Sequence, residues 1–206
     1  MSHSLNKLST TLPSAVQMRG PSSTFSATPE MILGPFYPTN CAPSISNDLT
    51  NQRGQTTRGQ HIHLTGRVLN KSLHPVNGAR IEIWQANSVG RYRHPGDRSP
   101  EPLDPAFDGF AAQTTGAEGT YKFRTVLPGP YLTPLRDMRA PHIHFQVTVG
   151  AFRLVTQMFF PAEPLNESDR FLRASLRREM LVALRVQDPS MRPLPSFTWD
   201  INLHCQ

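Results

Sequence analysis

The segment Ala79-Arg80-Ile81-Glu82-Ile83-Trp84 decides the expected fold, because apolar and polar side chains alternate strictly along it. Successive side chains of a β-strand point to opposite faces of the sheet, so this alternation is typical of a half-buried strand. The 206 residues also include 20 Pro and 13 Gly, which indicates many short segments joined by turns. A mainly β protein is therefore expected.

Similar patterns extend outward from this segment in both directions. Strands are predicted over 61–69, 111–115, 120–126, 142–149, 153–160 and 197–203, and Val76-Asn77-Gly78 supplies a hairpin-type turn. Two long loops, 87–110 and 132–141, interrupt the strands. A loop of such length inside a compact domain is usually functional or disordered.

One helix is expected near the C-terminus, over residues 169–186, with Asn166 or Ser168 as its N-cap. Apolar residues recur there at four-residue steps, as on one face of a helix. They are Leu172, Leu176, Met180 and Leu184. Short strands, long loops and one helix together predict an antiparallel β-sandwich core with long active-site loops and one peripheral C-terminal helix.

Length and composition favour one globular domain over residues 29–206, preceded by an arm over residues 1–28. The arm is rich in Ser, Thr and Pro and lacks the apolar region of a secretory signal. No run of about 18 apolar residues occurs, so no membrane span is predicted and a cytoplasmic location is expected. Cys41 and Cys205 have no metal-ligand spacing, and a bridge between them is left open.

The net charge of +6 raises the question of nucleic-acid binding. The basic residues are scattered, however, and no recognition helix, zinc finger or RNA-binding motif accompanies them. Nucleic-acid binding is therefore not expected. The positive charge suits the steering of anionic aromatic substrates instead.

The sharpest local motif is His142-Ile-His144, which follows Arg139 in a predicted strand. Residues two apart on a strand face the same side, so both imidazoles can hold one metal. The spacing alone leaves open a pair of ordinary half-buried histidines. The same spacing at His61-Ile-His63 has no other ligand type nearby in sequence, so we interpret those two as surface or sheet histidines.

Tyrosines offer a further ligand type, and the chain has only four of them. Tyr92 and Tyr131 lie in loops among Gly, Pro and Arg, where a tyrosine can simply anchor the loop on the core. A bound metal ion would lower the pKa of such a phenol far below its usual value of about 10.

Eight short motifs occur in an order that resembles the intradiol ring-cleavage dioxygenases, and within them the iron-bearing chain of the protocatechuate 3,4-dioxygenases. They are Gly34-Pro35-Phe36-Tyr37, Ile83-Trp84-Gln85-Ala86-Asn87, Gly90-Arg91-Tyr92-Arg93-His94, Leu103-Asp104-Pro105-x-Phe107-x-Gly109-Phe110, Tyr121-x-Phe123-Arg124-Thr125, Pro128-Gly129-Pro130-Tyr131, Arg139-x-Pro141-His142-Ile143-His144-Phe145 and Thr156-Gln157-Met158-x-Phe160. The resemblance covers residues 28–203 and implies an enzyme of aromatic catabolism.

By this resemblance four residues are the ligands of one non-haem Fe(III): Tyr92, Tyr131, His142 and His144. Arg139 and Gln157 match catalytic residues beside the iron, and Tyr131 matches the ligand that leaves to act as a base. Trp84, Tyr37, Pro35 and Arg139 match residues that bind the substrate.

The implied reaction inserts both atoms of O2 into a catechol and cleaves between the two hydroxylated carbons to a cis,cis-muconate-type diacid. The spacings Tyr131–His142 and His144–Gln157 are shorter than in the protocatechuate enzymes, and no tryptophan follows Tyr131. The resemblance therefore leaves the identity of the catechol open.

The partners expected from the resemblance are the catechol, O2 and further chains, in a homo-oligomer or a hetero-oligomer with an iron-free related chain. Two other classes stay open. One is a β-sandwich binding module without a metal. The other is an Fe(II) or Zn(II) enzyme that uses His61, His63, His142 and His144.

Overall fold

The computed structural model describes residues 25–38, 42, 46–51, 54–133, 135–187 and 193–205. Most of the regular structure is β, which confirms the predicted fold class. The strands are β1 (His61–Leu69), β2 (Arg80–Trp84), β3 (Phe110–Thr114), β4 (Thr120–Val126), β5 (Tyr131–Leu132), β6 (Met138–Arg139), β7 (His142–Val149), β8 (Phe152–Phe159), β9 (Leu184–Val186), β10 (Ser196–Thr198) and β11 (Ile201–Asn202).

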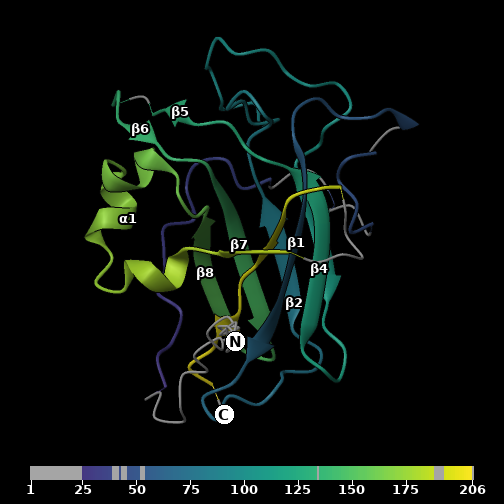
Figure 1. Cartoon of the computed structure of the whole chain (residues 1–206), viewed down its shortest axis with the longest axis vertical. Helices are drawn as coiled ribbons and strands as arrows, with labels where there is room; N and C mark the ends of the chain where they lie inside the picture. The colour runs from purple at the N-terminus through teal and green to yellow at the C-terminus, as the bar shows by residue number, and fades with distance from the viewer. Residues whose placement is uncertain are drawn as a thin grey trace, which may run out of the picture.

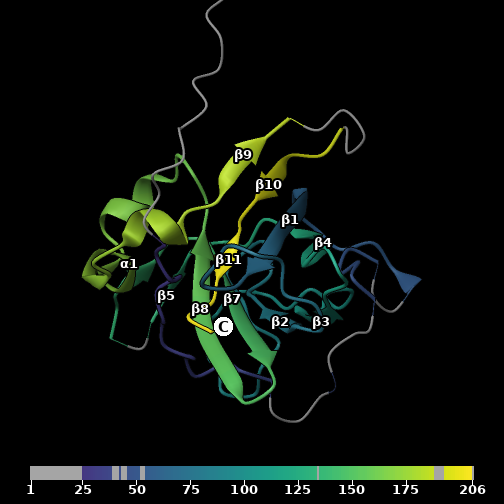
Figure 2. The same cartoon turned by 90° about the horizontal axis from the view of Figure 1, so that it is seen from below.

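The strands form two main sheets (Figures 1 and 2). One has four antiparallel strands in the order β3-β2-β7-β8. The other has five strands, in which β1 pairs antiparallel with β4 but parallel with β10 and β11. The second sheet is thus mixed and not purely antiparallel. A short hairpin, β5-β6, lies apart from both sheets.

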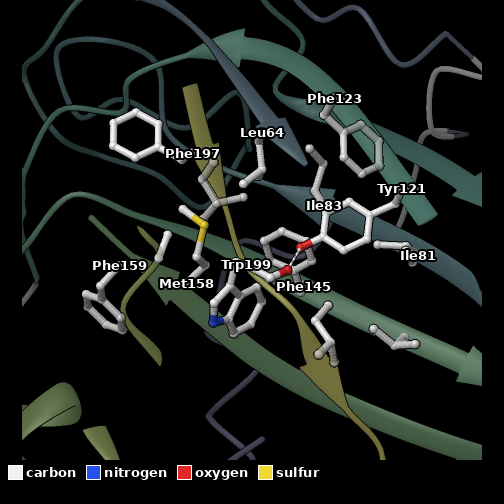
Figure 3. Packing of buried hydrophobic residues seen from close by; sticks show 14 of the residues in the cluster. Leu64, Ile81, Ile83, Tyr121, Phe123, Phe145, Met158, Phe159, Phe197 and Trp199 are labelled. Atoms are coloured by element: carbon white, nitrogen blue, oxygen red, sulfur yellow. Dashed lines mark hydrogen bonds between the residues drawn. The ribbon is translucent and has the colours of Figure 1, made fainter. Parts of the chain in front are cut away.

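The main core lies between the two sheets (Figure 3). Alternate residues of β1 and β2 point into it, among them Leu64, Ile81 and Ile83. Across the core, the Tyr121 and Phe145 rings lie 5.9 Å apart, and the Tyr121 hydroxyl donates a 2.5 Å hydrogen bond to the Trp199 carbonyl. The alternation that predicted the strands therefore places one face of each strand in this core.

The predicted helix over 169–186 is wrong in its extent. A 3₁₀ turn (Pro164–Glu167) precedes the segment, which itself contains the short helix α1 (Arg170–Ala174), a second 3₁₀ turn (Arg178–Leu181) and strand β9. Asp169 caps α1, in place of Asn166 or Ser168, and extended backbone at Ser175 ends it. Leu176 is fully exposed and Leu184 pairs β9 with β10, so neither belongs to an apolar helix face.

Two smaller predictions also need correction. Val76-Asn77-Gly78 does not close a hairpin, because β1 and β2 belong to different sheets. The predicted last strand over 197–203 is divided into β10 and β11, which both pair with β1.

Most of the expected arm, residues 1–24, and Cys41 lie outside the described residues. Cys205 is partly buried against the main core. In the part of the chain that the structure describes, no helix has the length and apolar character needed to cross a membrane.

Candidate metal centre

The candidate site lies on the face of the four-stranded sheet that points away from the main core. Ile143 and Phe145 of β7 are buried in that core, so His142 and His144 face the opposite side. Strand pairing sets Trp84 of β2 beside His144. Gln157 of β8 lies beside His144 on the other side. Trp84, His144 and Gln157 therefore form one row across three neighbouring strands.

The two imidazoles and one tyrosine converge closely. The Nε2 atoms of His142 and His144 lie 3.3 Å apart, and the Tyr131 hydroxyl lies 3.5 Å from His142 Nε2. Ligand atoms bound to one metal at roughly 2.1 Å, with angles of about 90–120° between them, lie roughly 3.0–3.6 Å apart. The spacing of these three atoms therefore fits a single metal ion.

His142 has the tautomer that a metal ligand requires. Its Nδ1–H donates a 2.6 Å hydrogen bond to the Ala140 carbonyl, which leaves the Nε2 lone pair facing His144 and Tyr131. Burial lowers the pKa of His142 well below its usual range, and the Arg139 charge adds to this. Burial and the neighbouring His142 lower the pKa of His144 in the same direction. Both imidazoles are therefore neutral and able to donate a lone pair.

Tyr92 supplies a second phenol to the cluster. Its ring lies edge-on to Tyr131, 5.4 Å away, and 6.2 Å from the ring of His144. Its hydroxyl is buried and has no hydrogen-bond partner among the described residues. Such an orphaned polar atom is costly unless something binds it. A cation among Tyr92, Tyr131 and the two imidazoles would satisfy it.

The phenols are neutral in the metal-free site. Burial raises the pKa of Tyr92 well above its usual range, and the nearby Tyr131 phenol adds to the rise. Burial also raises the pKa of Tyr131, although the Arg139 charge opposes the rise. A metal cation reverses this balance because it stabilises the phenolate form.

Close backbone packing brings the two tyrosine-bearing loops together. Gly90 has a positive φ of 86°, and a Cβ atom on it would overlap the Pro130 carbonyl oxygen. A Cβ on Gly129 would lie 2.6 Å from the Gly90 nitrogen. The Asn87 carbonyl accepts hydrogen bonds from the N–H groups of both glycines. Asp97 then fixes Tyr92 by accepting from its backbone N–H at 2.7 Å.

Arg139 is locked in place by buried partners. Its Nε donates to Asp169 Oδ2 at 2.8 Å, and one Nη donates to Gln157 Oε1 at 2.7 Å. Asp169 is 0% exposed and also accepts from the N–H groups of Ala140 and of the first turn of α1. The sequence motifs did not point to Asp169 as a residue of the site, although an Asp ahead of an apolar helical segment is a capping signal.

A cavity of about 280 Å³ opens beside Tyr131, with Pro35 and Arg139 in its lining. Trp84 lies outside this lining, is 1% exposed and stacks on His144 at 4.8 Å. Tyr37 also lies outside the lining and donates a 2.9 Å hydrogen bond to Glu82. Of the residues that the sequence suggested for substrate binding, Pro35 and Arg139 therefore face the cavity, whereas the Trp84 and Tyr37 rings pack on each other outside its lining, 5.0 Å apart.

The other His-x-His pair lies elsewhere. His61 and His63 belong to β1, in the five-stranded sheet, and His61 Nε2 lies 3.0 Å from the Thr57 carbonyl. Within the described ranges, no group of three or more His, Cys, Asp or Glu side chains could hold a metal. The phenols nearest to His142 and His144 are those of Tyr131 and Tyr92.

Comparison with known proteins identifies similar sequences. A family model described as a dioxygenase matches residues 32–205. The protocatechuate 3,4-dioxygenase beta chain of Burkholderia cepacia is 40% identical over 141 residues, 66% of this chain and 60% of the relative. The hydroxyquinol 1,2-dioxygenase of Rhizobium sp. (strain MTP-10005) is 33% identical over 174 residues, 77% of this chain and 55% of the relative. The chain thus spans less than two thirds of the length of these relatives.

Solved structures of dioxygenases are also similar to this chain. The dioxygenase domain of a dioxygenase–carbohydrate-binding fusion from Streptomyces sp. SirexAA-E matches with a TM-score of 0.67 and 27% identity, over 88% of this chain and 100% of that one. The mercury-inhibited catechol 1,2-dioxygenase of Acinetobacter sp. ADP1 matches with a TM-score of 0.68 and 28% identity, over 87% of this chain and 63% of that one.

Proposed function

The chain belongs to the intradiol ring-cleavage dioxygenase family, and from this premise we propose that it is a non-haem Fe(III) enzyme that opens a catechol ring between the two hydroxylated carbons. Both atoms of O2 would enter the product, a cis,cis-muconate-type diacid. The observation that carries the proposal is the convergence of Tyr131, His142 and His144 beside a cavity, with the orphaned Tyr92 hydroxyl close by.

Four residues would hold the iron: Tyr92, Tyr131, His142 and His144. When bound, Fe(III) would act as a Lewis acid that acidifies the catechol hydroxyls and makes the ring reactive toward O2. Two phenolates and two neutral imidazoles suit it, because hard anionic oxygen donors prefer an ion of high charge.

The two tyrosines have different surroundings and would have different roles. Tyr131 lines the cavity and is only partly buried, so its phenolate oxygen can accept a proton from a catechol hydroxyl. Tyr92 is 3% exposed and lies outside the cavity lining, so it would stay in place through the reaction.

Arg139 would stabilise the negative charge that develops on the substrate oxygens. It lines the cavity, is 2% exposed, and is held by Asp169 and Gln157. A cation fixed before the reaction in a site with little water is effective, because no reorganisation is needed as the charge forms.

The iron content and the colour of the protein test this proposal. Protein expressed with ample iron is expected to hold iron in equimolar amount and to be red to burgundy, since tyrosinate-to-Fe(III) charge transfer absorbs visible light. Metal analysis and a visible spectrum provide the measurement. A colourless protein that holds zinc instead would contradict the assignment, and a metal-free protein would indicate a binding module.

A further inference from the structure

The cavity beside Tyr131 bears on which catechol the site accepts. Tyr131 belongs both to the candidate ligand cluster and to the cavity lining, so a catechol whose hydroxyls face that cluster occupies this cavity. Most of the other lining residues are apolar or small: Ile32, Gly34, Pro35, Phe36, Leu135 and Phe171. Among the described residues that line the cavity, Arg139 and Arg170 are the charged ones.

Each of these two arginines already has a carboxylate partner. Arg139 lies 2.8 Å from Asp169 in a pair that is almost fully buried. Arg170 lies 3.0 Å from Asp137, and both side chains of this pair are partly exposed. Each positive charge of the cavity wall is therefore matched by a carboxylate that lies outside the cavity lining.

Phe171 holds both guanidinium groups in position. Its ring centroid lies 4.5 Å from the Arg139 guanidinium carbon and 4.7 Å from that of Arg170. Such contacts restrict the rotation of an arginine side chain as well as attracting its charge. Arg170 thus contacts both Asp137 and Phe171.

We propose that the site, if it has the function proposed above, prefers an uncharged catechol with an apolar ring substituent to a catechol that carries a carboxylate. A carboxylate in this cavity would lose water without gaining an unpaired cation. At Arg170 it would also lie beside the like charge of Asp137. An alkyl substituent instead gains contact with Ile32, Leu135 and Phe171.

The direct test compares 4-methylcatechol with protocatechuate, which carries a carboxylate at the same ring position. The iron-loaded full chain is expected to show a kcat/KM roughly tenfold or more higher for 4-methylcatechol, measured as O2 uptake. A smaller preference, or one for protocatechuate, would overturn the inference. Dissociation constants from calorimetry under anaerobic conditions require no turnover. These constants test the preference even if neither ring is opened. Failure to open either ring would contradict only the proposed function.

A variant tests the role of Asp137. Asp137→Asn keeps the side-chain shape but leaves the Arg170 charge unmatched, so the ratio of the two kcat/KM values should shift roughly tenfold toward protocatechuate. Glu167→Gln is the matched control, because it removes the same charge from the exposed Glu167–Arg178 pair, and neither residue lines the cavity. An unchanged ratio in Asp137→Asn, or an equal shift in the control, would show that the Asp137 charge does not set the preference.

Discussion

His142 shows how one backbone atom prepares a side chain for metal binding. The Ala140 carbonyl takes the Nδ1 proton at 2.6 Å, and burial lowers the pKa of the imidazole well below its usual range. The ring is therefore neutral, and its Nε2 lone pair faces the cluster. The His144 Nε2 atom lies 3.3 Å from the His142 Nε2 atom, and the His144 ring is held by stacking on Trp84, at 4.8 Å.

Removal of either imidazole should abolish iron binding. His142→Ala and His144→Ala each leave three of the four proposed ligands, and we expect purified protein of either variant to lack iron and visible colour. His61→Ala and His63→Ala provide the control with the same spacing on β1, and their activity should stay close to that of the unchanged protein. Iron loss in the β1 variants would show that the wrong pair was chosen.

The two tyrosines should differ when each hydroxyl is removed. Tyr131→Phe is expected to retain much of its iron but to turn over about 10²–10⁴-fold more slowly, because a general base is lost. Tyr92→Phe removes a buried ligand and should lose both iron and activity more severely. Metal analysis and O2 uptake measure the two effects, and identical losses in the two variants would refute separate roles.

At the level of elements, three neighbouring strands and two loops build the site. Strands β2, β7 and β8 align Trp84, His144 and Gln157 in one row, so the sheet fixes their spacing. The loop that follows β2 carries Tyr92, and the connection after β4 leads into β5, which begins at Tyr131. The two connections lie together at one end of the sheets (Figure 1). We expect the glycine contacts between these connections to position the phenols beside the imidazoles.

Gly90→Ala tests the contact between the loops. The new Cβ would overlap the Pro130 carbonyl oxygen, so the loops must separate and the iron content should fall. Gly78→Ala is the control for backbone strain alone, because Gly78 also has a positive φ of 75° but has open space around its Cβ position. The control should cost about 1–2 kcal/mol in urea unfolding and keep its iron. Full iron content in Gly90→Ala would contradict this role of the loop contact.

Asp169 connects α1 to the site, and its removal should be costly. Asp169→Ala leaves Arg139 buried without its carboxylate partner and should lower the free energy of unfolding by about 3–5 kcal/mol. Glu167→Ala breaks an exposed pair two residues earlier and should cost only about 0–1 kcal/mol. Similar losses in the two variants, measured by denaturant unfolding, would show that the buried pair does not stabilise the fold.

The sequence predicted those elements whose pattern follows from burial of one face. Strands β1, β4 and β7 begin and end where the alternation of their residues indicates. The helix prediction failed because leucines at four-residue steps also arise where each leucine has a separate environment: Leu172 is buried, Leu176 is exposed and Leu184 lies in β9. The motifs predicted that Tyr131, His142 and His144 lie together. The Arg139–Asp169 pair and the Gly90 contact could not be predicted, because they depend on tertiary packing between segments far apart in the sequence.

In the whole molecule, the two sheets form the framework and the loops complete the candidate site. The two sheets bury the core between them, which leaves the outer face of the four-stranded sheet for the histidines (Figures 2 and 3). Loop residues and the start of α1 then form the cavity, with Pro35, Tyr131, Arg139 and Phe171 in its lining. A β platform that leaves the cavity largely to loops suits a family whose relatives are named for protocatechuate, hydroxyquinol and catechol.

The fate of labelled dioxygen tests the central claim most directly. The iron-loaded protein is given 4-methylcatechol, or another catechol that it turns over, with isotopically labelled O2, and the product is analysed by mass spectrometry. The account predicts a muconate-type diacid, cleaved between the hydroxylated carbons, that contains both atoms of one O2 molecule. A yellow semialdehyde from cleavage outside the diol, a product with a single labelled atom, or activity that depends on added Fe(II) would contradict it.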